Sequence, residues 1–425
     1  MLTAIVFLGL LLAGFPIFAA ILAGAITFMI SSDLAILFDS IPIQLYGALE
    51  INGLLAIPLF MLVGEVMNKA GLTRKLIAVA EVLLGALRGG LAYANLFTNA
   101  MAASILGSAV AQIGVMSKVM IPEMERHGYK REFSGAVTVS AGLLGPIIPP
   151  SMLMIIYGVV AVQPIAPLFI AGIIPGLLIV AALAVVIFLH GVFGEPLPKG
   201  DPANRPHGTA RILFEGIAPG LIPVVVIVGI MAGVMTPTEA GAVASIIALI
   251  LGFLYRAIRW RDLPEILHAV AVHTATITCL IAAATVFSWV LAFEGVPDRM
   301  VELISGFTTS PFMFLLLVAL LMLVLGMLLE SISVLIVIVP ILMPAVLALG
   351  IDPIHFGVVA TVATVMGLVT PPVGPGLYIA MVQANLRMGA LFRATTPFLL
   401  AVLAMMVVII AVPELSTWLP SLSSR

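Results

Sequence analysis

The sequence predicts an all-α protein that crosses a lipid bilayer several times. Of its 425 residues, 62% are hydrophobic and 9% are charged, and the mean hydropathy is +1.28. Soluble domains carry roughly 25% charged residues. A membrane-crossing helix needs about 20 apolar residues. Runs long enough to cross lie at 3–30, 91–117, 165–190, 212–235, 238–256, 268–293 and 312–346. They are continuously apolar, whereas the strands of a membrane barrel alternate.

Charge and cysteine usage agree with a bilayer as the environment. The residues Met1–Ile5 lack the basic side chains of a cleavable signal peptide, so we expect the run 3–30 to be retained as a span. The net charge is −2 and no basic patch contains interleaved aromatic residues, so no nucleic acid is expected as a partner. The single cysteine, Cys279, cannot form an internal disulfide.

Two stretches of the chain carry the same pattern of glycine and proline. Gly145–Pro150 reads Gly-Pro-Ile-Ile-Pro-Pro, and Gly367–Pro372, which begins 222 residues later, reads Gly-Leu-Val-Thr-Pro-Pro. Flanking landmarks recur in similar order, namely Phe133 and Phe356, Tyr157 and Tyr378, Pro122 and Pro344, and Gly128 and Gly350. Matched landmarks in the same order, at separations of 221 to 223 residues, indicate an internal duplication.

The duplication divides the chain into two halves. The stretch 195–208 contains four prolines and two glycines, which oppose helix and predict a solvated linker. We expect N-terminal scaffold helices in 1–55, a first repeat in 56–190, a linker in 191–211, scaffold helices in 212–286, a second repeat in 287–415 and a tail in 416–425.

Each repeated motif is expected at the tip of a helical hairpin. About 12 residues from Phe133 to the first motif make ~18 Å of helix, which is too short for a span. We therefore expect hairpins at 133–161 and 356–385, with their tips at mid-depth. Gly145 and Gly367 would be left-handed residues that end a helix. The paired prolines would occupy the first turn of the next helix.

Such breaks leave polar backbone groups inside the membrane. Up to four carbonyl groups lose their partners where a helix ends, and a following proline turns the carbonyls of Ile148 and Thr370 out of the helical ladder. Carbonyl oxygens can bind a small cation, and the N–H groups of the next helix favour an anion. Matched broken helices are typical of transporter binding sites. The alternative is proline kinks in packed helices.

Five segments occur in the order typical of one transporter family. They are Ile57–Glu65 (IPLFMLVGE), Gly145–Ser151 (GPIIPPS), Thr236–Ala240 (TPTEA), Gly350–Gly357 (GIDPIHFG) and Gly367–Gly374 (GLVTPPVG). From about residue 1 to 415, the chain resembles the large membrane (M, DctM-type) subunit of tripartite ATP-independent periplasmic (TRAP) transporters.

The resemblance implies an elevator-type secondary transporter in the bacterial inner membrane, built from two inverted repeats, each with a re-entrant helical hairpin. It also implies uptake of a small organic anion, such as a C4-dicarboxylate, sialic acid or another sugar acid. The implied partners are a periplasmic substrate-binding protein and a small four-helix membrane subunit. The coupling ion would be Na⁺, with two or more ions per cycle.

The resemblance also implies the site residues. Tip carbonyls would form one sodium site at Gly145, Ile148 and Pro150, and another at Gly367, Thr370 and Pro372. The repeat register adds Ser104 to the first site and Gly326 to the second. The expected substrate-binding residues are Ser108, Ser151, Glu330, Ser331 and Ser333. The family often has Asn where Ala363 stands, and Thr361 or Thr364 could substitute for it.

Glu330 is singled out because an ionisable residue at membrane depth is usually functional; a helix-end charge is the alternative. Few titratable residues lie at depth, which favours sodium over protons.

Thr236 and Glu239 fit a capping box. His190, His268 and His273 have no metal-ligand spacing. No enzyme motif such as His-Glu-x-x-His is present. Two alternative functions are a stand-alone anion/sodium symporter, which needs no binding protein, and a structural scaffold.

Overall fold

The computed structural model describes residues 2–194, 196–199 and 209–423, and all regular structure in these ranges is helical. The first half contains α1 (Leu2–Leu12), α2 (Ile17–Ser31), α3 (Ile41–Leu49), α4 (Ala56–Lys69), α5 (Leu72–Leu84), α6 (Gly90–Leu106), α7 (Ala109–Arg126), α8 (Arg131–Gly142), α9 (Met152–Val160) and α10 (Ile165–Phe193). The second half contains α11 (Thr209–Met231), α12 (Pro237–Leu254), α13 (Leu263–Phe293), α14 (Val296–Phe307), α15 (Pro311–Leu328), α16 (Ser331–Ala348), α17 (Pro353–Gly367), α18 (Pro375–Ala384), α19 (Met388–Ala411) and α20 (Glu414–Ser423). Short 3₁₀ turns cover Ala35–Ser40, Asn52–Leu55 and Trp260–Asp262.

The prediction of a polytopic helical membrane protein is confirmed. Within the described ranges, 7 helices are long and apolar enough to cross a membrane, namely α10, α11, α12, α13, α15, α16 and α19. The number of candidate spans rises to 8 if the bent pair of α3 and α4 is counted as one span. The capping box that opens α12 is also confirmed, because Thr236 Oγ1 accepts the Glu239 N–H at 3.3 Å and Glu239 accepts the Thr236 N–H at 2.8 Å.

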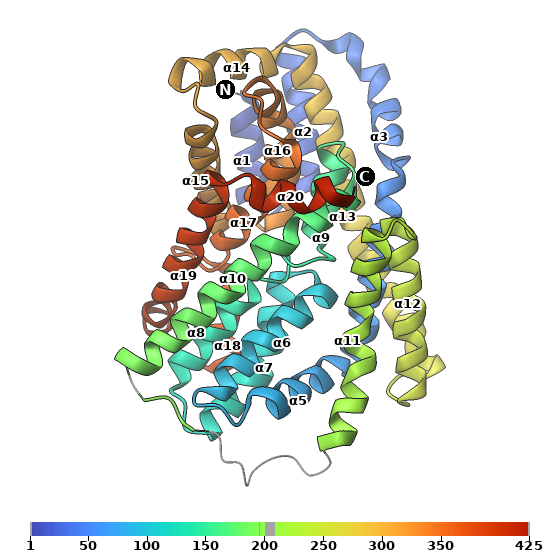
Figure 1. Ribbon diagram of the computed structural model, residues 1–425. Helices are drawn as coiled ribbons and strands as arrows, with labels where there is room; N and C mark the ends of the chain where they lie inside the picture. Colours follow the sequence, from blue (N-terminus) through green and yellow to red (C-terminus); the bar gives the residue numbers. More distant parts are fainter. Residues whose placement is uncertain (1, 195, 200–208, 424–425) are drawn as a thin grey trace.

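The duplication is visible in the helix boundaries. From α5 to α10, each helix of the first half has a counterpart about 222 residues later, so that α7 begins at Ala109 and α16 at Ser331. The halves are inverted: α5 lies at the bottom of Figure 1 and its counterpart α14 at the top. They also exchange contacts, since α9 packs against α16 while α18 packs against α7.

Each half contains a helical hairpin, but at a different place from the one predicted, and its re-entrant character stays a prediction. In the first half, Asn95 in α6 donates a hydrogen bond to the sulfur of Met124 near the end of α7, at 3.4 Å. Gln112 near the start of α7 donates to the Asn99 carbonyl at 2.7 Å. The two helices are therefore antiparallel, with the tip at Gly107 and Ser108. The expected span 91–117 contains this tip.

The second half forms its hairpin from α15 and α16. Helix α15 runs beside α17 until Gly326 meets Gly367. Helix α16 then returns toward α14, where Pro340 lines a small pocket together with Val296. The tip lies at Leu329 and Glu330, inside the apolar run 312–346 that suggested a single span.

The predicted hairpins at 133–161 and 356–385 are wrong. Helices α8 and α9 lie end to end along the 29-residue helix α10. Phe133 in α8 stacks on His190 near the end of α10, with ring centroids 4.3 Å apart. Gly158 in α9 lies against Leu168 near the start of α10. The stretch 131–160 is thus one interrupted span, and α17 and α18 lie along α19 in the same way. A short apolar helix can end by turning back or by breaking, and its length does not distinguish the two.

The helices form two bodies. Helices α1–α4 pack with α11–α13 as a scaffold, and the hairpins and interrupted spans pack with α10 and α19. Helix α4 packs against α12 and α13, so the scaffold extends beyond residue 55. The other predicted domain boundaries stay a prediction.

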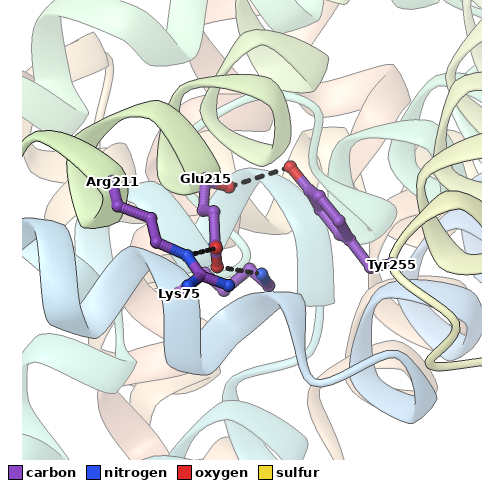
Figure 2. Close-up of polar contacts among 4 residues, drawn as sticks. All are labelled: Lys75, Arg211, Glu215 and Tyr255. Carbon is purple, nitrogen blue, oxygen red and sulfur yellow. Dashed lines mark hydrogen bonds and ion pairs between the residues drawn. The ribbon is translucent and has the colours of Figure 1, made fainter. Parts of the chain in front are cut away.

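A polar cluster connects α5 to the scaffold (Figure 2). Glu215 in α11 accepts from Lys75 Nζ at 2.6 Å and from Arg211 Nε at 2.7 Å. Tyr255 at the end of α12 donates to the Glu215 carbonyl at 3.0 Å, and Lys75 Nζ lies 3.9 Å from the centre of the Tyr255 ring. The cluster fastens the helix that precedes the first hairpin to α11 and α12.

Candidate substrate and ion site

Four helix interruptions surround one cavity of about 690 Å³. The two hairpin tips contribute Gly107, Ser108, Glu330 and Ser331, and the two broken spans contribute Pro146, Pro150 and Leu368. The opposite wall comes from the scaffold helices α2, α4 and α13. The cavity therefore lies at the junction of the two bodies, where unpaired backbone groups gather.

Four of the predicted substrate-binding residues line this cavity: Ser108, Glu330, Ser331 and Ser333. The fifth, Ser151, does not. It is fully buried, and its hydroxyl donates to the Pro146 carbonyl and accepts the Met154 N–H at 3.2 Å. The Ser151 hydroxyl thus helps to close the break between α8 and α9, and its contact with the substrate stays a prediction.

The prolines and glycines of the motifs have roles other than those expected. Pro149-Pro150 and Pro371-Pro372 are joined by cis peptide bonds within the breaks, ahead of the helices that follow. Neither Gly145 nor Gly367 has a positive φ, so the left-handed conformation predicted for them is wrong. Both glycines lie in tight contacts instead. A Cβ at Gly145 would lie 2.7 Å from Gln112 Oε1.

The first break offers free carbonyl oxygens at its predicted sodium ligands. The Leu144 carbonyl accepts the N–H groups of Ile147 and Ile148 at 3.0 and 2.9 Å. In the described ranges, no hydrogen bond reaches the carbonyl oxygens of Gly145, Ile148 or Pro150. The side chain of Ser104 lies outside the described residues. The sodium assignment stays a prediction, and the free oxygens fit it.

Gln112 is a residue that the sequence reasoning missed. Its Nε2 donates to the backbone oxygen and Oδ1 of Asn99, at 2.7 and 2.9 Å. Its Oε1 is buried without a hydrogen-bond partner beside Gly145. A buried oxygen that no donor reaches is costly unless something else binds it. A hard cation, which takes oxygen ligands, would satisfy Gln112 Oε1 and the nearby carbonyls together.

The second break is built differently. A Cβ at Gly367 would lie 2.5 Å from the Leu323 oxygen and 2.6 Å from Gly326 Cα, so α15 and α17 touch through two glycines. The Gly367 carbonyl already accepts the Thr370 N–H at 3.1 Å. In the described part of the chain, the Thr370 and Pro372 carbonyl oxygens accept no hydrogen bond. These two remain the free oxygens of the predicted second site, and Gly326 has a packing role.

Of the two threonines expected to replace Asn at position 363, one has a free hydroxyl. Thr364 donates to the Ala360 carbonyl at 2.6 Å, whereas the buried Thr361 hydroxyl has no partner. The two halves thus repeat the same break but surround it with different polar side chains.

Comparison with known proteins identifies the family. Residues 4–415 match the family described as "Tripartite ATP-independent periplasmic transporter, DctM component". The chain belongs to this family. It is 34% identical over 98% of its length to the sialic acid TRAP transporter large permease protein SiaM of Vibrio cholerae, covering 97% of that protein. It is 35% identical over 94% of its length to the C4-dicarboxylate TRAP transporter large permease protein DctM of Pseudomonas aeruginosa, covering 93% of it.

The fold is also found in a solved structure. The Alcanivorax borkumensis YdaH transporter matches 89% of this chain and 88% of its own with a TM-score of 0.68 at 14% sequence identity. Membership of the DctM family makes the chain a multi-pass inner-membrane permease with a role in substrate uptake, and not an enzyme.

Proposed function

We propose that this permease carries a small organic anion into the cell together with Na⁺, after a periplasmic binding protein has delivered the anion. A small four-helix membrane subunit would complete the transporter. The observation that carries this proposal is the convergence of four helix interruptions on one cavity between two bodies. Relatives at similar identity are named for sialic acid, C4-dicarboxylate and 2,3-diketo-L-gulonate, so organic anions are the substrate class that they share.

The oxygen atoms at and near the two breaks favour sodium as the coupling ion. The oxygen atoms without a hydrogen-bond partner at and near the breaks belong to backbone carbonyls, the Gln112 amide and the Thr361 hydroxyl. All of these are uncharged oxygen ligands. Proton-coupled transporters instead rely on chains of titratable side chains. One net charge that crosses 100 mV contributes about 2.3 kcal/mol, so two sodium ions that accompany a monovalent anion could use the membrane potential to concentrate it roughly 40-fold.

The division into two bodies supports an elevator mechanism. The hairpin tips and breaks belong to one body, and the facing wall of the cavity belongs to the scaffold. Sliding the first body past the second would carry the whole site across the membrane without rebuilding it. The cluster in Figure 2 would hold α5 to the scaffold during this movement.

Transport in proteoliposomes tests the proposal. The chain would be reconstituted with its small subunit, and a radiolabelled anion supplied on the binding protein. We expect uptake only with an inward sodium gradient, and none when choline replaces sodium and a proton gradient is imposed. Uptake on the proton gradient alone would refute sodium coupling. Equal uptake without the binding protein would instead favour a stand-alone anion/sodium symporter.

A further inference from the structure

We propose that the cavity selects an acid with a single carboxylate and several hydroxyl groups, such as a sugar acid, over a dicarboxylate. This inference rests on the proposed function, since it concerns the anion that the same cavity would carry. Its basis is a difference between the two ends of the cavity, where the first half presents free N–H groups and the second half presents a carboxylate.

The end built by the first half favours an anion. Helices α7 and α9 both begin there, and a Cβ at Gly107 would lie 3.6 Å from the Met152 nitrogen, so the two helix starts are neighbours. Ser108 accepts the Ala111 N–H at 3.4 Å. The preceding N–H groups of α7 lack partners within the helix, as do those of the first turn of α9. Two adjacent helix starts provide donors and positive potential for one carboxylate.

The end built by the second half has the opposite character. By the repeat register, Glu330 stands where the first half has Ser108, and it precedes α16 without capping it. Its side chain is exposed to the cavity. The neighbouring Ser331 is 3% exposed, lines the cavity and has a hydroxyl without a hydrogen-bond partner. An unpartnered buried hydroxyl beside a carboxylate is a ready site for substrate hydroxyl groups.

The remaining charges reinforce the difference. None of the described residues that line the cavity is Lys or Arg, and Glu65 and His273 stand on the scaffold side. A second substrate carboxylate at this end would lie beside Glu330 with no fixed cation between them, and like charges in a partly desolvated site repel. A polyhydroxyl chain would instead donate to Glu330. A volume of about 690 Å³ is large enough for a sugar acid.

Binding of two matched probes tests the inference. The full chain with its small subunit, purified in detergent, would be titrated with gluconate, which has one carboxylate on a polyhydroxyl chain, and with succinate, which has two carboxylates. Sodium is held constant, and thermal stabilisation reports the dissociation constants. We expect gluconate to bind at least about tenfold more tightly, the effect of one charge-assisted hydrogen bond.

Variants of Glu330 assign the preference. Glu330→Gln should weaken gluconate about tenfold and leave succinate unchanged or tighter. Glu330→Asp keeps the charge and should keep the preference. Glu302→Gln on α14, which does not line the cavity, is the matched control and should change neither constant.

Three results would overturn the inference: succinate binding as tightly as gluconate, binding of neither acid, or an unchanged preference in Glu330→Gln. Repeating the titration with choline in place of sodium distinguishes a failure of this inference from a failure of the sodium-coupling proposal. A gluconate preference that persists without sodium supports the selectivity and contradicts only the coupling ion.

Discussion

Replacing Gly367 by alanine should separate α15 from α17 and destabilise the protein. The new Cβ would lie 2.5 Å from the Leu323 oxygen and 2.6 Å from Gly326 Cα. Both are backbone atoms, so no side chain can rotate away. Carbon contacts need about 3.5 Å, which requires the helices to part by roughly 1 Å. Overpacking of this kind costs about 1–3 kcal/mol, less the ~1 kcal/mol by which alanine favours helix.

Gly389→Ala is the matched control. Gly389 lies in the first turn of α19 and a Cβ there would meet nothing within 4 Å, so this change should be neutral or stabilising by up to about 1 kcal/mol. Thermal unfolding in detergent, followed by intrinsic fluorescence, should place Gly367→Ala below the control by a few degrees, or about 2 kcal/mol. Equal stability of the two variants would refute the tight glycine contact.

Three further changes test other parts of the structure. Gln112→Leu should raise the sodium concentration that gives half-maximal thermal stabilisation about tenfold, which corresponds to ~1.4 kcal/mol of binding free energy. Asn95→Leu is the control: it breaks the same polar network farther from the break and should lower stability without changing that sodium concentration. Thr236→Ala should cost about 1 kcal/mol through loss of the cap of α12, whereas Thr238→Ala should not; equal unfolding temperatures would contradict the cap. Glu215→Gln should lower the unfolding temperature only slightly in low salt and less in high salt, because its side chain is 32% exposed and salt screens its ion pairs. A salt-independent loss would argue against the ion pairs.

The interruptions were predictable from the sequence, but their topology was not. Proline pairs in apolar runs marked the breaks at Pro149 and Pro371. Whether the chain turns back there depends on contacts with α10 and α19, which involve residues far along the chain. The true first tip had a local signal within an apolar run, since Gly107 adopts a left-handed φ of 60° and Ser108 caps α7.

The candidate site was predicted best where the repeat register applied. Comparing the halves paired Ser108 with Glu330, and the structure brings both to one cavity. The same comparison could not find Gln112, because the corresponding residue of the second half is the apolar Val334. A search for polar residues that occur in both halves therefore passes over it. The place of Ser151 was harder to predict, because a serine before a helix can bind a ligand or its own backbone, and the sequence does not show that its hydroxyl donates to the Pro146 carbonyl.

The inverted halves differ in their polar contacts, which bears on the relative energies of the conformations that the permease would adopt. If each half took up the other's local geometry, the mouth of the cavity would open toward the opposite face of the membrane. The first hairpin is tied by amide side chains at Asn95, Asn99 and Gln112, whereas the corresponding residues Leu317, Leu321 and Val334 offer only apolar packing. In the proposed elevator mechanism, the inward-open and outward-open forms would therefore differ in energy even without substrate or sodium, and the hairpin without amides would be the easier one to deform.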